Sequence, residues 1–428
     1  MKIKKIKAFE VLDSRGTPTI AAFIELKDGT REFGFVPSGA STGSREAIEK
    51  RDNGKNFNGK GVEKVIKFAE ENLFPELLDK EFKDQKNFDE RLISLDGTKN
   101  KERFGANIIL ATSLAFCKLS STILKKPLYK HIHDYFLENF YKETQMKMPL
   151  PMMNILNGGA HANNNLDFQE FMIQPVGFSS FKEGLICGVE IFNVLKNTLN
   201  EKGFSTAVGD EGGFAPGISS AEEALDLITS AVEAAGYEIN KDITFALDCA
   251  STELLKNTKY SFSNAKKLSS DELIEYLSQL NKNYPITSIE DGLDENDWDG
   301  WRKMTEKLGK LTQLVGDDLF VTNQDILQEG IDKKVANSVL IKINQIGTLT
   351  ETFETIRLAY ENNYKCVISH RSGETEDSFI ADLAVGTGAG QIKTGAPSRS
   401  DRTSKYNRLL MIDAFENLKY LGRGELKN

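Results

Sequence analysis

Six apolar stretches in the second half of the chain each contain, or end in, residues that can carry charge. From Glu290 onward these residues recur every 23 to 28 positions, after a longer interval of 42 positions from Asp248. An interval near 25 residues accommodates one strand, one helix and two connections, which is the period of a (β/α)8 barrel. Barrels place catalytic side chains at the C-terminal ends of their strands. We therefore expect one site that contains Asp248, Glu290, Asp317, Lys342, His370, Arg371 and Lys393.

The same alternation of strands and helices would also fit an open, doubly wound α/β sheet. Such sheets commonly bind dinucleotides through a glycine-rich turn after the first strand, and no such turn occurs in this region. The barrel is therefore the preferred fold, with residues 141–428 as the catalytic domain. The longer interval before Glu290 predicts additional structure around residues 256–267.

Lys342 lies in the apolar run Ser338–Gly347, whose pattern predicts a strand buried on both faces. A buried ammonium group is unfavourable unless it meets a partner, a cavity or water. One interpretation is a structural ion pair near the strand end. The other is a base, because burial lowers the pKa of a lysine and a second ammonium group, Lys393, would lower it further. Lys342 taken alone does not decide between them.

Three carboxylates, Asp248, Glu290 and Asp317, lie at the ends of successive predicted strands. If they converge at the mouth of a barrel, they repel one another unless a cation lies between them. An all-oxygen ligand set suits Mg²⁺, and the lack of cysteine and histidine in it disfavours zinc. Any one of the three could instead be a helix cap or an ion-pair partner. Three carboxylates at the ends of three successive predicted strands, however, favour a metal site.

Two glycine-rich segments add further carboxylates. NGGAHANNNLDFQEF contains His161, Gln169 and Glu170, and AVGDEGGFAP contains Glu211 between glycines. Two carboxylates held close together raise each other's pKa, which makes one of them a candidate general acid. The alternatives are a turn residue for Glu211 and an ordinary loop histidine for His161.

An anion site is predicted at Arg371 and Ser372, because a guanidinium group matches the oxygens of phosphate and carboxylate. Residues 36–47, VPSGASTGSREA, predict either an ordinary connection or a mobile lid that closes over an anion. Ser44 is expected to cap a helix after this loop. A base, a general acid, a metal site and an anion site together fit one type of reaction. In that reaction a proton is removed next to a carboxylate and a hydroxyl group is lost.

Residues 1–140 predict a smaller α+β domain in front of the barrel. Its expected strands are 3–12, 19–26 and 31–36, followed by helices near 62–78, 85–94 and 105–124. Residues 130–147 are aromatic, charged and poorly periodic, which places the domain boundary there. His131 and His133 in this stretch are interpreted as surface residues without a partner.

Composition narrows the function classes. The chain has 428 residues and a net charge of −9, which argues against nucleic acid as the main ligand. Four scattered cysteines without metal-type spacing are typical of reduced thiols in a cytoplasmic protein. The first residues lack the apolar core of a signal peptide, and no run approaches the length needed to span a bilayer.

The motifs around these residues resemble those of the enolase family, of bacterial type, over essentially the whole chain. They occur in family order: VLDSRGTPT, VPSGASTG, NGGAHANNN with QEFMIQP, VGDEGGFAP, SIEDGLDENDWDGW, LIKINQIGTLTET, SHRSGETED and GTGAGQIKTGAPSRSDR. The resemblance implies an α+β cap followed by an eightfold α/β barrel with irregular first strands. It also implies a reversible, Mg²⁺-dependent dehydration of 2-phospho-D-glycerate to phosphoenolpyruvate. Use of a lysine or histidine base with Mg²⁺ is general in the wider superfamily.

The resemblance also implies residue roles. Lys342 removes the C2 proton, and Glu211, assisted by Glu170, protonates the leaving 3-hydroxyl, with His161 on a second mobile loop. Two Mg²⁺ are implied per site, the second arriving with the substrate; the implied metal residues are Asp248, Glu290, Asp317 and Ser41. Substrate binding is implied for Gln169, Lys342, His370, Arg371, Ser372 and Lys393.

For assembly, the resemblance implies a cytoplasmic homodimer, with octamers in some bacterial relatives. Some relatives bind plasminogen at the cell surface through a terminal lysine, and the Lys427-Asn428 end gives this secondary role only weak support. Two other functions stay open. An acid-sugar dehydratase on the same barrel is disfavoured by the phosphate-type residues Arg371, Ser372 and Ser41. A non-catalytic scaffold protein would not need the catalytic residues.

Overall fold

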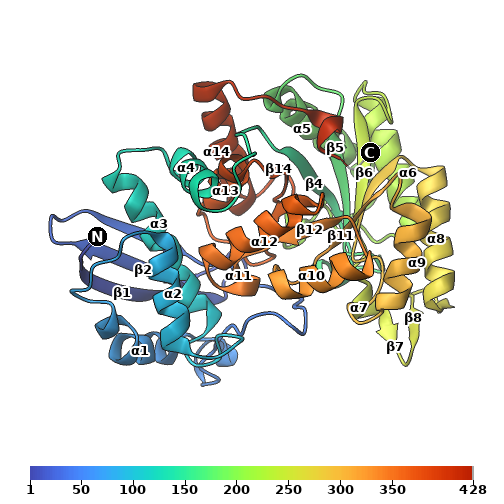
Figure 1. Cartoon of the computed structure of the whole chain (residues 1–428). Helices are drawn as coiled ribbons and strands as arrows, with labels where there is room; N and C mark the ends of the chain where they lie inside the picture. The colour runs from blue at the N-terminus through green and yellow to red at the C-terminus, as the bar shows by residue number, and fades with distance from the viewer. Residues whose placement is uncertain (427–428) are drawn as a thin grey trace.

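The structure is a computed structural model that describes residues 1–426. Figure 1 shows an N-terminal sheet with its helices beside a barrel that is surrounded by helices. Eight strands of the second part close into one barrel, which confirms the predicted fold class.

The N-terminal part is built on an antiparallel sheet of β1 (Ile3–Leu12), β2 (Pro18–Leu26) and β3 (Arg31–Phe35). Helix α3 (Ala106–Ile123) packs across β2 and β3. Gly34 permits this close approach, because a Cβ atom there would lie 2.2 Å from the carbonyl oxygen of Ala111. The remaining helices of this part are α1 (Glu63–Asn72), α2 (Gln85–Asp96) and α4 (Leu128–Asn139), with 3₁₀ turns at Asn56–Gly59 and Phe74–Glu76.

Three expectations for this part were wrong. Residues 44–55 form turns and irregular chain rather than a helix, and the N–H group of Ser44 donates to Glu295 instead of starting one. The helix expected over 62–78 ends at Asn72, before the 3₁₀ turn that contains Pro75. The stretch 130–147 begins inside α4, where His131 is buried and His133 Nδ1 lies 2.9 Å from the carbonyl oxygen of Gly386.

The barrel strands follow the order β4–β5–β6–β10–β11–β12–β13–β14, and β14 pairs with β4. Only β5 runs antiparallel to its neighbours, so its first residue lies at the same end of the barrel as the last residues of β4 and β6. The strands are β4 (Leu150–Asn157), β5 (Glu170–Pro175), β6 (Ile243–Asp248), β10 (Ile286–Glu290), β11 (Gln313–Gly316), β12 (Ser338–Ile341), β13 (Lys365–Ser369) and β14 (Gly390–Lys393).

Apolar side chains fill the barrel interior, as in other closed α/β barrels. Six strands contribute one residue each to a separate buried cluster: Met152, Met172, Ala246, Val315, Leu340 and Val367. The surrounding helices are α5 (Phe181–Glu201), α6 (Ala221–Ala234), α8 (Ser270–Asn283), α9 (Trp298–Leu308), α10 (Gln324–Lys333), α12 (Leu349–Glu361), α13 (Phe379–Thr387) and α14 (Ser400–Glu416), with short helices α7 (Ser251–Leu254) and α11 (Ile343–Ile346).

A small three-stranded sheet lies between β6 and α8 and accounts for the long interval before Glu290. Its strands are β7 (Leu255–Lys256), β8 (Lys259–Ser261) and β9 (Lys267–Leu268). The additional structure expected around residues 256–267 is therefore present.

Helix α3 corrects the expectation that no run is long enough to span a bilayer. Among residues 1–426 it alone has the length and composition of a membrane-crossing helix. However, 83% of its 18-residue apolar window is buried inside the protein, against the N-terminal sheet. This burial is typical of a core helix.

The N-terminal part also caps a helix of the barrel. The N–H group of Thr350, in the first turn of α12, donates to Asp89 Oδ2 on α2 over 2.9 Å, and the Thr350 hydroxyl donates to the same atom. Leu349 N–H donates to Ser113 Oγ on α3. Helix starts leave N–H groups without intrahelical partners, so these contacts join α12 to the N-terminal part. Burial raises the pKa of Asp89 to about 6.

This raised pKa predicts a pH-dependent contribution to stability. Because the folded protein holds the Asp89 proton more tightly than the unfolded chain does, stability is lost as pH rises through the folded pKa. Between pH 5 and 7 the wild type should lose roughly 1 kcal/mol of unfolding free energy relative to Asp89→Asn, which cannot titrate. Urea denaturation of both proteins at each pH measures this difference. A difference that is constant across this range would contradict the prediction.

Candidate active site

The predicted ionisable residues lie at one end of the barrel. Asp248, Glu290 and Lys393 are the last residues of β6, β10 and β14. Asp317, Lys342 and His370 directly follow β11, β12 and β13. Lys342 therefore lies just beyond its strand, at the start of α11, rather than inside the strand as the apolar run suggested. Because the strands are parallel, their ends bring these six residues together.

Glu170 reaches the same end by a different route. It is the first residue of the antiparallel strand β5 and pairs with Asp248 on one side and Asn157 on the other. His161 follows β4 in a 3₁₀ turn (Gly159–His161), and its Nδ1 atom lies 3.4 Å from Oε1 of Glu211. The two glycine-rich segments thus converge on the strand ends.

A small pocket brings ten of the predicted residues together. It encloses about 250 Å³ of empty space. The predicted residues that line it are Ser41, His161, Gln169, Glu170, Glu211, Lys342, His370, Arg371, Ser372 and Lys393, joined by Ser369. Size does not identify this pocket, because a larger open cleft of about 1610 Å³ lies elsewhere.

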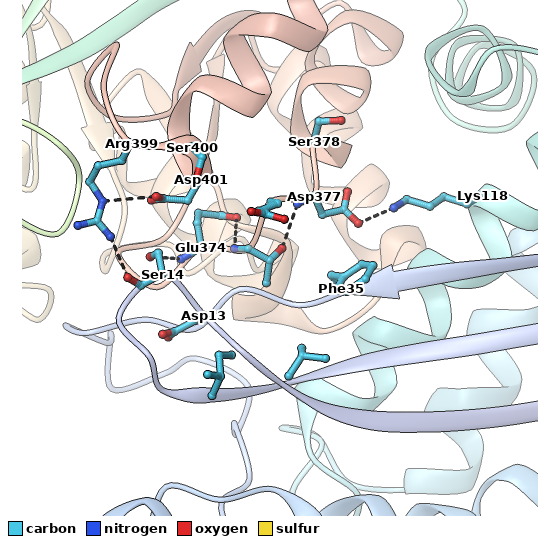
Figure 2. A pocket seen from close by; sticks show the side chains of 14 residues that line it. Asp13, Ser14, Phe35, Lys118, Glu374, Asp377, Ser378, Arg399, Ser400 and Asp401 are labelled. Carbon is cyan, nitrogen blue, oxygen red and sulfur yellow. Dashed lines mark hydrogen bonds and ion pairs between the residues drawn. The ribbon is translucent and has the colours of Figure 1, made fainter.

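The larger cleft lies between the N-terminal sheet and the barrel loops (Figure 2). Arg399 donates to the backbone oxygen of Ser14 over 2.8 Å, and Lys118 pairs with Asp377 across the same space. The N–H group of Glu374 donates to the Ser14 hydroxyl. None of the predicted catalytic, substrate-binding or metal residues lines this cleft.

Ammonium groups contact the three predicted metal carboxylates. Lys393 Nζ lies 2.9 Å from Asp248 Oδ2 and 2.8 Å from Glu290 Oε1, and Lys342 Nζ pairs with Asp317 Oδ2. The three carboxylates do not form a tight ligand cluster themselves. Within residues 1–426, the groups whose ligand atoms lie within 4.8 Å of one another are His161 with Glu170 and Glu211, and Asp291 with Asp317 and Asp318.

The carboxylates nevertheless have the chemistry of a cation site. Glu290 is fully buried, and its Oε2 atom has no hydrogen-bond partner in the described structure. Burial, followed by the charge of Asp248, raises the pKa of Glu290 well above its usual value. A buried carboxylate with an unpartnered oxygen requires a proton or a cation. The residues therefore fit Mg²⁺, which binds oxygen ligands.

The expectation that burial and Lys393 lower the pKa of Lys342 was wrong for the state of the protein that the structure describes. Burial is the largest single effect and lowers the pKa of Lys342, and Asp317 is the largest effect that raises it; the net shift of the pKa is upward. Burial likewise disfavours the charge of Lys393, yet Asp248, Glu170 and Glu290 raise its pKa well above the usual value. Both lysines are charged here because they neutralise the buried carboxylates.

Glu170 and Glu211 differ in the direction of their pKa shifts. Burial and the charge of Glu211 raise the pKa of Glu170 well above its usual value. Burial also disfavours the Glu211 carboxylate, but His370, His161 and Arg402 outweigh it and lower the pKa of Glu211. The pair therefore separates as expected for close carboxylates, but Glu170 rather than Glu211 holds the proton in this state.

The N-terminal loop of residues 36–47 closes one side of the pocket. Ser38 forms a backbone bridge with Gly373, and the carbonyl oxygen of Ser41 accepts a hydrogen bond of 3.0 Å from Arg371 Nη2. Arg371 also donates from both terminal nitrogens to the carboxylate of Glu46, over 3.0 and 3.1 Å. The bidentate geometry with Glu46 is the one that Arg371 would offer to a phosphate or carboxylate group.

Sequence reasoning missed four residues that hold the pocket. Asn154 Nδ2 donates to Glu211 Oε2 over 3.0 Å, and Gln345 Nε2 donates to Asp317 Oδ1 over 2.8 Å. Glu46 holds Arg371, and Arg402 donates to His370 Nδ1. Gln345 and Arg402 lie inside quoted motifs, LIKINQIG and SRSDR, so their motif membership was the available signal. Glu46 lies in the quoted segment 36–47, whereas nothing in the sequence pointed to the contact of Asn154.

The chain matches two family models in succession. The model "Enolase, N-terminal domain" matches residues 3–132, and "Enolase, C-terminal TIM barrel domain" matches residues 145–428. Among similar proteins, enolases of Legionella pneumophila strains Lens, Philadelphia 1 and Corby are 55%, 54% and 54% identical over 429 aligned positions, each alignment covering all of both chains. With the pocket at the barrel mouth, these matches show that the chain belongs to the enolase family, the phosphopyruvate hydratases, which are hydro-lyases.

Proposed function

We propose that the chain catalyses the reversible dehydration of 2-phospho-D-glycerate to phosphoenolpyruvate and water, a step of glycolysis. One observation carries this proposal: Lys342, Glu211 and Arg371 line a single small pocket. A base, an acid–base carboxylate and an anion-binding group can therefore contact the same ligand. In this scheme Lys342 removes the C2 proton, and Glu211 protonates the leaving 3-hydroxyl.

The Glu170–Glu211 pair supports the acid half of this scheme. Ligand atoms of both carboxylates and of His161 lie within 4.8 Å of one another. Because Glu170 has the raised pKa and Glu211 the lowered one, Glu170 stores the proton. We propose that this proton reaches Glu211 before the hydroxyl leaves, and that His161 keeps the two carboxylates close.

Substrate binding is proposed for the polar groups around this centre. The guanidinium group of Arg371 would exchange Glu46 for the phosphate of the substrate, because both are bidentate acceptors. Ser372 lies beside it in the same lining, which also supports binding roles for Gln169, Lys342, His370 and Lys393.

Mg²⁺ is proposed as the cofactor, held by Asp248, Glu290 and Asp317, with Ser41 meeting a second ion that arrives with the substrate. The unpartnered oxygen of Glu290 supports the first position. Bound Mg²⁺ would supply positive charge that stabilises the carboxylate of the substrate as it gains negative charge. In the described structure Lys393 pairs with Asp248 and Glu290, and Lys342 pairs with Asp317. The ammonium groups of both lysines must therefore change partners when Mg²⁺ binds these carboxylates.

The metal proposal predicts that EDTA abolishes dehydration and that added Mg²⁺ restores it. Formation of the enol product is followed by its ultraviolet absorbance. Glu290→Gln removes one negative ligand, so a much higher Mg²⁺ concentration should be needed for half-maximal activity. Activity that is indifferent to EDTA would contradict the metal proposal. Turnover of an unphosphorylated acid sugar in preference to 2-phosphoglycerate would instead favour the acid-sugar dehydratase reaction.

For organisation, we propose a capping domain of residues 1–140 and a catalytic domain of residues 141–428. This boundary is supported by the family-model matches, the first of which ends at residue 132 and the second of which begins at residue 145. A homodimer, or an octamer, is supported by membership of the enolase family, and apolar side chains that are exposed in the single chain are candidates for the contact between subunits. They include Phe9, Leu12, Phe33, Met411 and Phe415. Mass measurement in solution tests the assembly.

A cytoplasmic location is supported by the four cysteines, all free and buried. Residues Lys427-Asn428, which we relate to binding of plasminogen at the cell surface, lie outside the described residues. This secondary role stays a proposal, and a plasminogen-binding assay with the full chain tests it.

A further inference from the structure

Arg402 on α14 is a fully buried arginine that joins the two loops beside the pocket. Its Nη1 atom donates to His370 Nδ1 over 2.5 Å and to the carbonyl oxygen of Arg371 over 2.6 Å. Its Nη2 atom donates to the carbonyl oxygens of Ser372, over 2.6 Å, and Asp210, over 2.9 Å. One guanidinium group thus connects the segment after β13 to the residue that precedes Glu211.

The contact with His370 determines where the imidazole carries its proton. A guanidinium group has five donors and no acceptor. His370 Nδ1 must therefore accept, which leaves the ring proton on Nε2. Burial lowers the pKa of His370 to about 3, so the ring is neutral at neutral pH. The orientation and the tautomer of His370 are consequently linked to Arg402.

The other ring nitrogen faces the pocket. His370 Nε2 lies 3.3 Å from Glu211 Oε1, and in the described structure it has no partner with hydrogen-bond geometry. His370 and Glu211 both line the pocket, whereas Arg402 does not. A buried, unpartnered N–H group that lines a ligand pocket is available to a ligand oxygen.

We propose that Arg402 is a positioning residue that fixes His370 as a neutral N–H donor beside Glu211, so that His370 binds the leaving oxygen and does not itself transfer a proton. This inference rests on the proposed dehydration. A fixed donor that points at an oxygen gaining negative charge stabilises the transition state without reorganisation. The links to Asp210, Arg371 and Ser372 also hold Glu211 and His370 at a constant separation.

The first test needs no variant. The chain has four histidines, so histidine-selective ¹⁵N labelling of the full-length protein gives few signals, and His370→Gln identifies those of His370. We expect Nδ1 to show the signal of an unprotonated ring nitrogen and Nε2 that of an N–H group at neutral pH. A protonated Nδ1, or a charged ring, would overturn the proposal.

The second test separates positioning from structural support. Arg402→Met removes the donor to Nδ1, so the tautomers should mix and kcat should fall by roughly 10- to 100-fold, with KM changed less than about threefold. Arg402→Lys keeps one charged donor and should recover part of kcat. An unchanged tautomer in Arg402→Met would overturn the proposal.

Lys405 provides a matched control on the same helix. It is also fully buried, and its ammonium group donates to the carbonyl oxygens of Thr375 and Asp401 without contacting His370. Lys405→Met should lower Tm as Arg402→Met does, but leave the His370 tautomer and kcat as in the wild type. Equal loss of kcat and of the tautomer in both variants would show that Arg402 has only a structural role.

His370 variants test the donor role directly. Glutamine can place an amide N–H group near the position of Nε2, whereas asparagine is too short to do so. His370→Gln should therefore retain at least about tenfold more kcat than His370→Asn. Equal activity of the two would contradict the donor role. A wild-type protein without dehydratase activity would refute the proposed function, and the ¹⁵N signals would still report the tautomer.

Discussion

Lys342→Ala is expected to lower kcat for 2-phosphoglycerate by about 10³-fold or more and to abolish exchange of the C2 hydrogen with solvent. Lys342 is the proposed base, and its ammonium group lines the pocket. Both readouts should be lost together, because exchange needs only the proton transfer that precedes loss of the hydroxyl group. Exchange is measured by NMR in deuterium oxide, and kcat by ultraviolet absorbance.

The ion pair with Asp317 makes this prediction sharper. Lys342 is charged in the described state because Asp317 raises its pKa. A lysine acts as a base only when neutral, so Asp317 must be neutralised by a different partner, at the position proposed for Mg²⁺. A purely structural Lys342 would leave exchange intact in any variant that still folds.

Lys101 offers a matched control for Lys342. It is also a buried lysine in a carboxylate pair, with Glu351, but it lies outside the pocket. Lys101→Ala should lower stability while kcat and C2 exchange stay close to wild type. Substantial turnover in Lys342→Ala, or loss of exchange in Lys101→Ala without unfolding, would contradict the assignment of the base.

Glu211→Gln is expected to separate the two halves of the reaction. The proposed base remains, so C2 exchange should continue, whereas dehydration should fall by about 10²- to 10⁴-fold because the amide cannot protonate the leaving hydroxyl. The substitution keeps the size of the side chain, and its amide can still bond Asn154. Glu170→Gln should give a smaller loss if Glu170 only stores the proton. Simultaneous loss of exchange and dehydration in Glu211→Gln would assign this residue a role in the first step as well.

The barrel and much of the site could be predicted from the sequence because both depend on the strand period. Ionisable residues at intervals of 23 to 28 positions lie at or just after the C-terminal ends of parallel strands, and such ends meet at one side of a barrel. Asp248, Glu290 and Lys393 close their strands, as that pattern requires.

The remaining features depend on contacts between distant segments. Nothing in the period indicates that β5 runs antiparallel, although this direction brings Glu170 to the mouth. The raised pKa of Glu170 arises from burial and the charge of Glu211, and the lowered pKa of Glu211 arises from His370, His161 and Arg402. These groups come from distant parts of the chain. The expected helix after Ser44 failed for the same reason, since local capping preference was overridden by a contact with Glu295.

The loop of residues 36–47 is made early in synthesis, but its binding partners are made late. Ser41 is held by Arg371, which lies 330 positions further along the chain, and Ser38 pairs with Gly373. Until that segment leaves the ribosome, a glycine- and serine-rich loop has none of these anchors and is accessible to proteases. Cleavage in this loop therefore marks incomplete or partly unfolded chains, and resistance to cleavage reports that the last barrel strands are in place.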